Sequence, residues 1–153
     1  MSLQILKIMK TSKRTLVYLA AAVWYIGGIM LFRSGMELII QTREMKSDIL
    51  WPLIIITLGI TLGIFQVFFI FRHSCRKNLQ RINQLEDPRL WQFYRPDFFL
   101  ALAIMITSGI LLDHFAQGHY YFMLGVAAVD IALTISLLGS SYIFWTDIKL
   151  ISD

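Results

Sequence analysis

The sequence has little charge and almost no cysteine. Cys75 is the only cysteine among 153 residues, so the chain can form neither an internal disulfide nor a CxxC pair, which excludes a thiol–disulfide oxidoreductase. Charged residues make up 16% of the chain and apolar residues 57%, against an apolar fraction of roughly half in soluble domains. Glycine-rich phosphate loops, HExxH and a Ser/His/Asp arrangement are also missing. The sequence therefore offers no catalytic residue, and an enzyme is the less favoured interpretation.

The three histidines are too far apart to share a metal ion or a haem. His73 follows the second apolar run, whereas His114 and His119 lie after the third, and a hydrocarbon core of about 30 Å separates the two levels. Asp113 and His114 alone provide too few ligands for zinc. We predict no metal and no cofactor, and we expect Asp113 or His114 to pair with Arg33 near the outer surface.

Four long apolar runs are the main feature of the chain, and about 20 apolar residues cross the hydrocarbon core as a helix. The predicted spans lie at about 15–32, 51–71, 96–112 and 120–145. We therefore predict an all-α fold, a transmembrane four-helix bundle in which residues 1–153 form a single membrane domain of two hairpins. Residues 33–50 allow two interpretations: an extended or bent first helix, which we favour, or a helix at the membrane surface. A tight polar turn is expected at 113–119.

A basic connector, residues 72–95, joins the two hairpins. Lys and Arg near spans resist translocation, so a connector of this kind stays on the cytoplasmic side. Eleven of the fourteen Lys and Arg residues lie in the N-terminal segment, this connector and the C-terminal tail, against three in the outer segments. This bias places both termini in the cytoplasm, and the net charge of +4 orients the protein rather than binding nucleic acid. The candidates for lipid headgroup binding are Arg72, Arg76, Lys77 and Arg81.

Asp130 is the most informative single residue. It lies about eleven residues into the fourth run, ~16 Å below the outer surface at ~1.5 Å per residue. An ionised carboxylate at that depth is unfavourable, so Asp130 marks either a functional site or a hydrogen bond between helices. The candidates for ligand or ion binding are Asp130, Thr134 and, at matching depth, Tyr25, Thr61, Thr107 and Ser108.

Small residues predict where the helices pack. In the fourth run Gly125, Ala128 and Ala132 fall on one stripe, which favours close packing of another helix. The stripe with Asp130 and Thr134 lies roughly 150° away, at ~100° per residue. The fourth helix therefore has two faces that avoid lipid.

The second run contains a GxxxG at Gly59 and Gly63, and Gln66 and His73 continue the same face. This spacing is typical of helix association.

A longer pattern extends from the connector into the third run. It consists of Arg76-x-Asn78-Leu79-x-Arg81-Ile82, the aromatic stretch 91–94, then Ile104-Met105 and Gly109. Over residues 70–145 the chain thereby resembles a group of small bacterial four-span inner-membrane proteins. The resemblance implies a location in the bacterial cytoplasmic membrane.

The favoured function is that of a non-enzymatic polytopic membrane protein, a self-associating interaction or accessory component. Its expected partners are membrane lipids and either further copies of the chain or another membrane protein, with no nucleic acid. Two alternatives stay open. The first is a small channel or transporter that uses Asp130, and the second is a lipid- or quinone-handling membrane enzyme that uses the basic connector.

Overall fold

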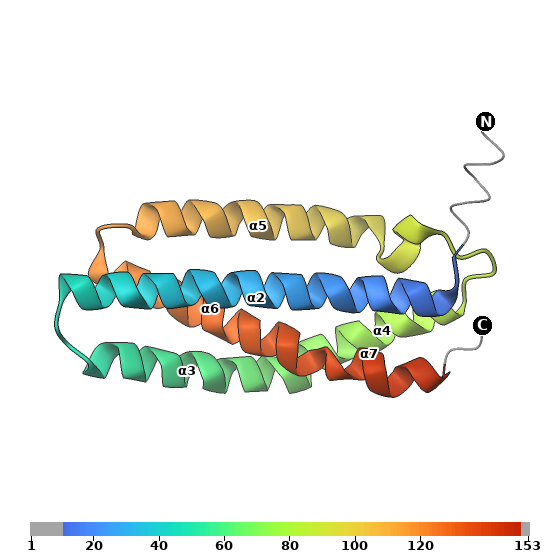
Figure 1. Ribbon diagram of the computed structural model, residues 1–153, viewed down its shortest axis with the longest axis horizontal. Coiled ribbons are helices and arrows are strands. Elements are labelled where there is room, and N and C mark those ends of the chain that lie inside the picture. The colour runs from blue at the N-terminus through green and yellow to red at the C-terminus, as the bar shows by residue number, and fades with distance from the viewer. Residues whose placement is uncertain (1–10, 151–153) are drawn as a thin grey trace.

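The computed structural model describes residues 11–150, apart from the side chains of residues 98, 99, 101, 102 and 150. Over that range the chain is helical and contains no strand, as predicted. The first elements along the chain are α2 (Lys13–Met45), α3 (Leu50–Gln66), the π-helical η1 (Val67–Phe71) and α4 (Arg72–Asn83). After the 3₁₀ turn η2 (Leu90–Phe93) come α5 (Pro96–Ala116), α6 (Tyr120–Ser140), α7 (Tyr142–Thr146) and η3 (Asp147–Leu150) (Figure 1).

Three helices are long and apolar enough to cross a membrane. They are Lys13–Met45, Leu50–Asn83 and Tyr120–Lys149, and a shorter apolar helix covers Ala103–Ala116. The composition and length of these helices support a membrane protein. Residues 33–45 continue α2 without interruption, and the helix ends at Met45, so the favoured extended helix covers most of the segment 33–50 but not its last residues.

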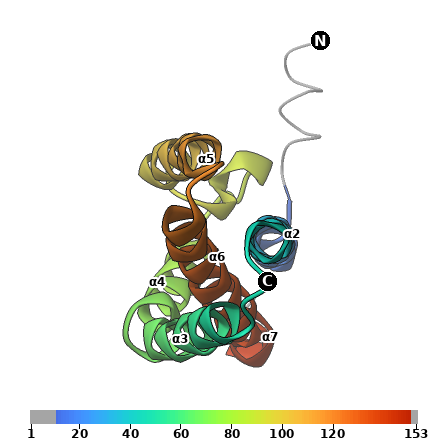
Figure 2. The same cartoon turned by 90° about the vertical axis from the view of Figure 1, so that its left-hand side faces the viewer.

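Helix α6 lies at the centre of the molecule, between α2 and α3, and α5 contacts it mainly near the loop that joins the two (Figure 2). Close packing against α3 depends on two glycines. A methyl group at Gly59 would lie 3.0 Å from the Ala128 carbonyl oxygen, and one at Gly63 would lie 2.7 Å from that of Ala132. These four small residues therefore lie at the contact between α3 and α6, and small side chains allow helix backbones to approach this closely.

Two other expectations about small or polar faces fail. A methyl group at Gly125 would have no neighbour within 4 Å among the described residues, because the close contact between the backbones of α3 and α6 begins only at Ala128. His73 is exposed, whereas Gly63 is buried. The π-helical segment η1 has more residues per turn than an α-helix, so it changes the phase of the helix and turns Cys75 and Leu79 inward instead.

The opposite face of α6 packs on α2. A methyl group at Gly35 would lie 3.1 Å from Asp130 Cβ, and the Thr134 hydroxyl donates to the carbonyls of Asp130 at 2.8 Å and Gly28 at 3.4 Å. Asp130 is 6% exposed. The prediction that α6 has two faces turned away from lipid is therefore confirmed.

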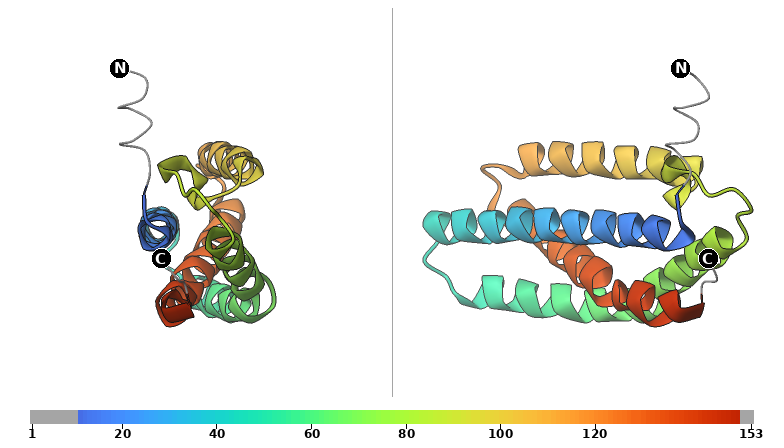
Figure 3. Two further views of the ribbon diagram at one scale, coloured as in Figure 1. Left: turned by 90° about the vertical axis from the view of Figure 1, so that its right-hand side faces the viewer. Right: turned by 45° about the vertical axis from the view of Figure 1, so that its right-hand side comes forward.

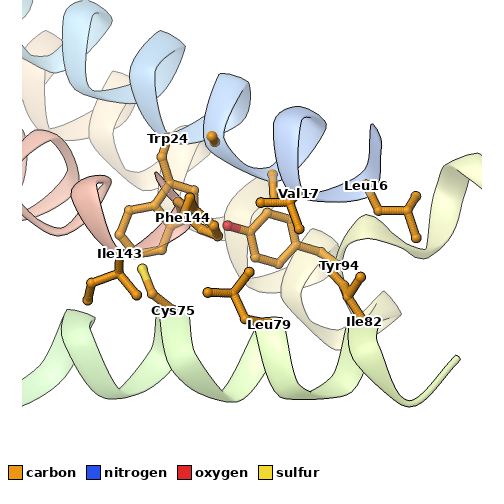
Figure 4. Close-up of a cluster of buried hydrophobic side chains, with 11 residues drawn as sticks. Leu16, Val17, Trp24, Cys75, Leu79, Ile82, Tyr94, Ile143 and Phe144 are labelled. Atoms are coloured by element: carbon orange, nitrogen blue, oxygen red, sulfur yellow. The ribbon is translucent and has the colours of Figure 1, made fainter. Parts of the chain in front are cut away.

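The basic connector closes one end of the molecule through a hydrophobic cluster between α2, α4 and α7 (Figure 4). The Asn78 amide donates to the Phe93 carbonyl at 2.9 Å, and the Arg81 guanidinium donates to the Gln92 carbonyl. These bonds fold the connector back so that Tyr94 enters the cluster, where burial raises the pKa of its phenol. Cys75 is fully buried in the same cluster, so its thiol is a packing group.

The exposed apolar side chains define a band around the helices. Along α3 and η1 they run from Ile49, the residue before α3, to Ile70. This is about 32 Å of helix and matches a hydrocarbon core of about 30 Å. Trp51 contacts Tyr121 at one edge, with ring centroids 6.0 Å apart. Tyr18 contacts Trp145 at the other edge, with centroids 5.6 Å apart. Paired aromatics at both edges are typical of membrane interfaces.

On α2, the residues at the level of this band lie further along the chain than the predicted span 15–32. Trp24 packs edge-on against Phe71 at the end of the band, with centroids 5.4 Å apart. The first turns of α2, including Leu16 and Val17, pack against α4 and Tyr94 in the connector. The part of α2 that lies within the band therefore starts near Trp24 and contains the polar residues that follow position 32.

Candidate functional site

The polar residues inside the apolar band converge where α2, α5 and α6 meet. The Ser34 hydroxyl of α2 donates to Asp113 Oδ2 of α5 at 2.9 Å. Asp130 of α6 lies beside this pair, because a methyl group at Gly35, the residue that follows Ser34, would lie 3.1 Å from Asp130 Cβ. Among the described residues, Asp130 Oδ2 is buried and has no hydrogen-bond partner. We call Ser34, Asp113 and Asp130 the acidic cluster.

A cavity of about 320 Å³ opens beside the acidic cluster, between α2 and the end of α5. We call it the outer cavity, and its lining residues are Met30, Arg33, Ser34, Glu37, Leu38, Gln41, Asp113 and Gln117. Most of these side chains are polar, which is unusual for a position level with exposed apolar side chains. The cavity reaches from the α5–α6 loop to the acidic cluster.

The acidic cluster lies near the middle of the band. Asp130 contacts α2 at Gly35, and the next residue of α6, Ile131, contacts α3 at Gly59. Gly59 is about halfway between Ile49 and Ile70, the ends of the exposed apolar run along α3 and η1. A bilayer centred on this band therefore has the acidic cluster close to its midplane, where charged groups require partners or water.

Acidic residues outnumber basic residues around the outer cavity. Glu37 and Asp113 line it and Asp130 lies behind it, whereas Arg33 is the one basic residue in its lining. Within residues 11–150, Arg33 forms no ion pair with Glu37 or Asp113. The expected pairing of Arg33 with Asp113 or His114 is therefore corrected: Asp113 accepts a hydrogen bond from Ser34, and His114 is exposed.

The Ser34 hydroxyl donates to the Asp113 carboxylate, and Asp130 Oδ2 has no donor among residues 11–150. Ser34 can donate only one hydrogen bond at a time, and two like charges in an apolar setting repel each other strongly. The cluster can relieve that repulsion by sharing a proton or by binding a cation. This is the chemistry that the site supports.

The buried hydroxyls between the acidic cluster and the connector end are already used in packing. Thr134 donates to backbone carbonyls, Ser140 donates to the Ser136 carbonyl, and Ser141 donates to that of Leu138 at 2.7 Å. Ser136 donates to Gln66 Oε1 at 2.7 Å. Thr134 and Ser136 thereby join α6 to α2 and α3, whereas Ser140 and Ser141 donate to carbonyls of α6 itself. These hydrogen bonds do not form a side-chain relay from Asp130.

Four of the predicted candidate residues lie away from Asp130. Tyr25 accepts a hydrogen bond from Trp145 Nε1 at 3.0 Å, at the edge of the band nearest the connector. Thr61, Thr107 and Ser108 are exposed, and their hydroxyls donate to carbonyls of their own helices. Of the predicted candidates, Asp130 belongs to the acidic cluster, and Thr134 lies one turn further along α6 and donates to the Asp130 carbonyl.

The sequence interpretation missed Ser34 and Glu37 as site residues, and it placed Asp113 in a turn. Helix α5 continues to Ala116, which keeps Asp113 on a helical face one turn before the loop. The polar turn is therefore limited to residues 117–119, where Gly118 has a positive φ of 81°. The signal that could have found the site is the four-residue spacing of Arg33 and Glu37, with Ser34 between them.

The lipid headgroup candidates divide into two groups. Arg76 is half exposed and lies 3.7 Å from Asp147, and Lys77 is exposed. Arg81 binds the Gln92 carbonyl, and the Arg72 Nε is buried. Arg76 and Lys77 thus have the accessibility that a headgroup site needs, whereas Arg81 holds the connector in place.

The chain therefore combines a three-helix core, an acidic cluster at mid-band and a polar cavity that opens beside it. In comparisons with known proteins, no family model, no curated protein and no solved structure matches this chain.

Proposed function

We propose that this protein is a non-enzymatic, four-span membrane protein of the bacterial cytoplasmic membrane that self-associates as an interaction or accessory component. The connector and both termini lie on the cytoplasmic side in this proposal. The distribution of Lys and Arg supports that orientation, and the apolar band with aromatic pairs at both edges supports the membrane location.

The observation on which self-association rests is the exposure of α5. Every residue from 103 to 112 is exposed except Gly109, which is half-buried. Helix α5 is fixed mainly at its outer end, where Ala116 is fully buried beside α2 and α6. Figure 3 shows α5 at the edge of the molecule. Helices α2 and α6, in contrast, have buried faces along their length.

The partner that fits α5 best is the α5 of a second copy. Residues 98–112 carry no charge, so the partner surface must also be uncharged and membrane-embedded, and α5 itself meets both requirements. Two copies related by a two-fold axis would bury the same surface on each. The GxxxG at Gly59 and Gly63 is occupied by α6 of the same chain, so it is not the surface for association.

Cysteine cross-linking tests this proposal. Cys75 is fully buried, so the natural chain has no reactive thiol and serves as the background. In membranes treated with a mild oxidant, we expect Ile106→Cys and Ile110→Cys to form disulfide-linked dimers, because both side chains lie on the exposed surface of α5. Dimers are measured on a non-reducing gel.

Phe69→Cys is the matched control, because it is at least as exposed as the α5 positions but lies in η1, which follows α3. It should remain monomeric. Equal cross-linking at Phe69 and on α5 would indicate random collision, and monomers at both α5 positions would remove α5 as the association surface.

A channel or transporter is the second candidate function, and the acidic cluster favours it, because intramembrane carboxylates often mark ion pathways. If the protein conducts, Asp130→Asn should abolish ion flux into reconstituted vesicles while the chain stays folded. The control is Asp97→Asn, at an exposed carboxylate paired with Arg95, which should leave flux unchanged. Flux that survives Asp130→Asn would remove Asp130 from any transport mechanism.

A further inference from the structure

We propose that the outer cavity binds a small organic cation that carries an ammonium group, with Asp113 and Glu37 as its charge partners. This inference goes beyond the functions proposed above, because it needs neither a second copy of the chain nor a path across the membrane. Its basis is the shape of the cavity and the charge of the side chains around it.

The carboxylates around the outer cavity outnumber its basic groups. Glu37 and Asp113 face the cavity and Arg33 is the one cation in its lining. Behind Ser34 and Asp113, the Asp130 carboxyl group is 6% exposed, and its Oδ2 has no partner among residues 11–150. Buried polar atoms without partners are rare in native proteins. A cation in the cavity offsets this excess of negative charge.

The size of the cavity favours an organic cation over a bare metal ion. A volume of about 320 Å³ falls within the range of small-molecule sites, and it is about ten times the ~30 Å³ that a water molecule occupies in the liquid. In the described part of the chain, no group of three or more His, Cys, Asp or Glu residues is placed to hold a metal ion.

The lining also offers the contacts that an ammonium group and a short carbon chain need. An ammonium group has three donors, and the carboxylates of Glu37 and Asp113 and the amide oxygens of Gln41 and Gln117 are acceptors for them. Met30 and Leu38 supply apolar surface. The cavity lies beside the α5–α6 loop, so a ligand would enter from the side opposite the connector.

Binding of 1,4-diaminobutane to the full-length chain tests the proposal. The chain is reconstituted in nanodiscs of zwitterionic lipid, so that anionic lipids do not compete, and binding is measured by calorimetric titration. We expect saturable binding of 1,4-diaminobutane and none of 1,4-butanediol, which has a similar length and no charge. Glu37→Gln and Asp113→Asn should each weaken binding by about ten-fold or more, because each removes a charge-assisted hydrogen bond.

Two further variants make the test decisive. Asp97→Asn removes the same charge from the other end of α5, at a side chain 80% exposed, and should bind like the natural chain. Arg33→Gln removes the competing cation and should tighten binding. Glu37 is exposed, so Glu37→Gln reports on binding even if Asp113→Asn fails to fold. Absent binding, equal weakening by Asp97→Asn, or equally strong binding of Mg²⁺ would each overturn the proposal.

Discussion

Gly63→Leu is expected to separate α3 from α6 and to lower the free energy of unfolding by at least about 3 kcal/mol, the upper end of what overpacking typically costs. A methyl group at this position would already lie 2.6 Å from Ile135 Cβ and 2.7 Å from the Ala132 carbonyl oxygen. The second contact is to a helix backbone, which cannot move aside as a flexible side chain can. Chemical unfolding in detergent micelles, followed by circular dichroism, measures the loss.

Gly125→Leu is the matched control. Gly125 also lies in a helix, α6, but the space around its Cβ position is open to 4 Å within the described structure. This variant should be neutral or slightly more stable, because leucine favours a helix over glycine by somewhat less than about 1 kcal/mol. An equal loss in both variants would show that the contact between α3 and α6 does not determine stability.

The sequence was sufficient for those features that depend on a single helix. The uncharged runs predicted the helices, because length and apolar composition decide what can cross a bilayer. The two faces of α6 followed from ~100° per residue, and Ala132 and Thr134 do face α3 and α2, respectively. For residues 33–50 the favoured interpretation was an extended or bent first helix, and α2 does continue through residue 45.

The sequence did not predict how far each helix is shifted along its axis relative to its neighbours. Tyr25 was expected at the depth of Asp130, yet the residue of α2 that contacts Asp130 is Gly35, ten positions further along, or about 15 Å. The first turns of α2 lie beside the connector because the Asn78 and Arg81 side chains fold the connector back to meet them. Such long-range contacts leave no local periodic signal.

The acidic cluster illustrates the same limit. Asp113 was assigned to a turn, because an Asp followed by His, Gln and Gly is typical of loops. Packing of Ala116 against α2 and α6 keeps this segment helical instead, and that packing places Asp113 beside Ser34. Asp130 could be recognised from its depth alone, whereas its neighbours could be recognised only from the fold.

The paired carboxylates lead to a further expected result on stability. Asp130→Asn should raise the free energy of unfolding by about 1–3 kcal/mol, the range for satisfying a buried unpaired polar group. The substitution removes one of two like charges and introduces an amide that can donate to Asp113. Asp113→Asn should raise stability for the same reason. Unfolding in detergent micelles at neutral pH measures both.

The double variant distinguishes electrostatic repulsion from separate local effects. If repulsion between Asp113 and Asp130 is the cause, either substitution relieves it, so the gain in the double variant should be clearly smaller than the summed gains of the single variants. The gains should also vanish at a pH low enough to protonate the pair in the natural chain, because protonation removes the same charge. Asp97→Asn, at an exposed carboxylate, should change stability by no more than about 0.5 kcal/mol. Additive gains would mean that each carboxylate is unfavourable for a separate local reason, which contradicts repulsion within the pair. A loss of stability in each single variant would mean that both carboxylates are already compensated in the folded chain and that the acidic cluster needs no cation.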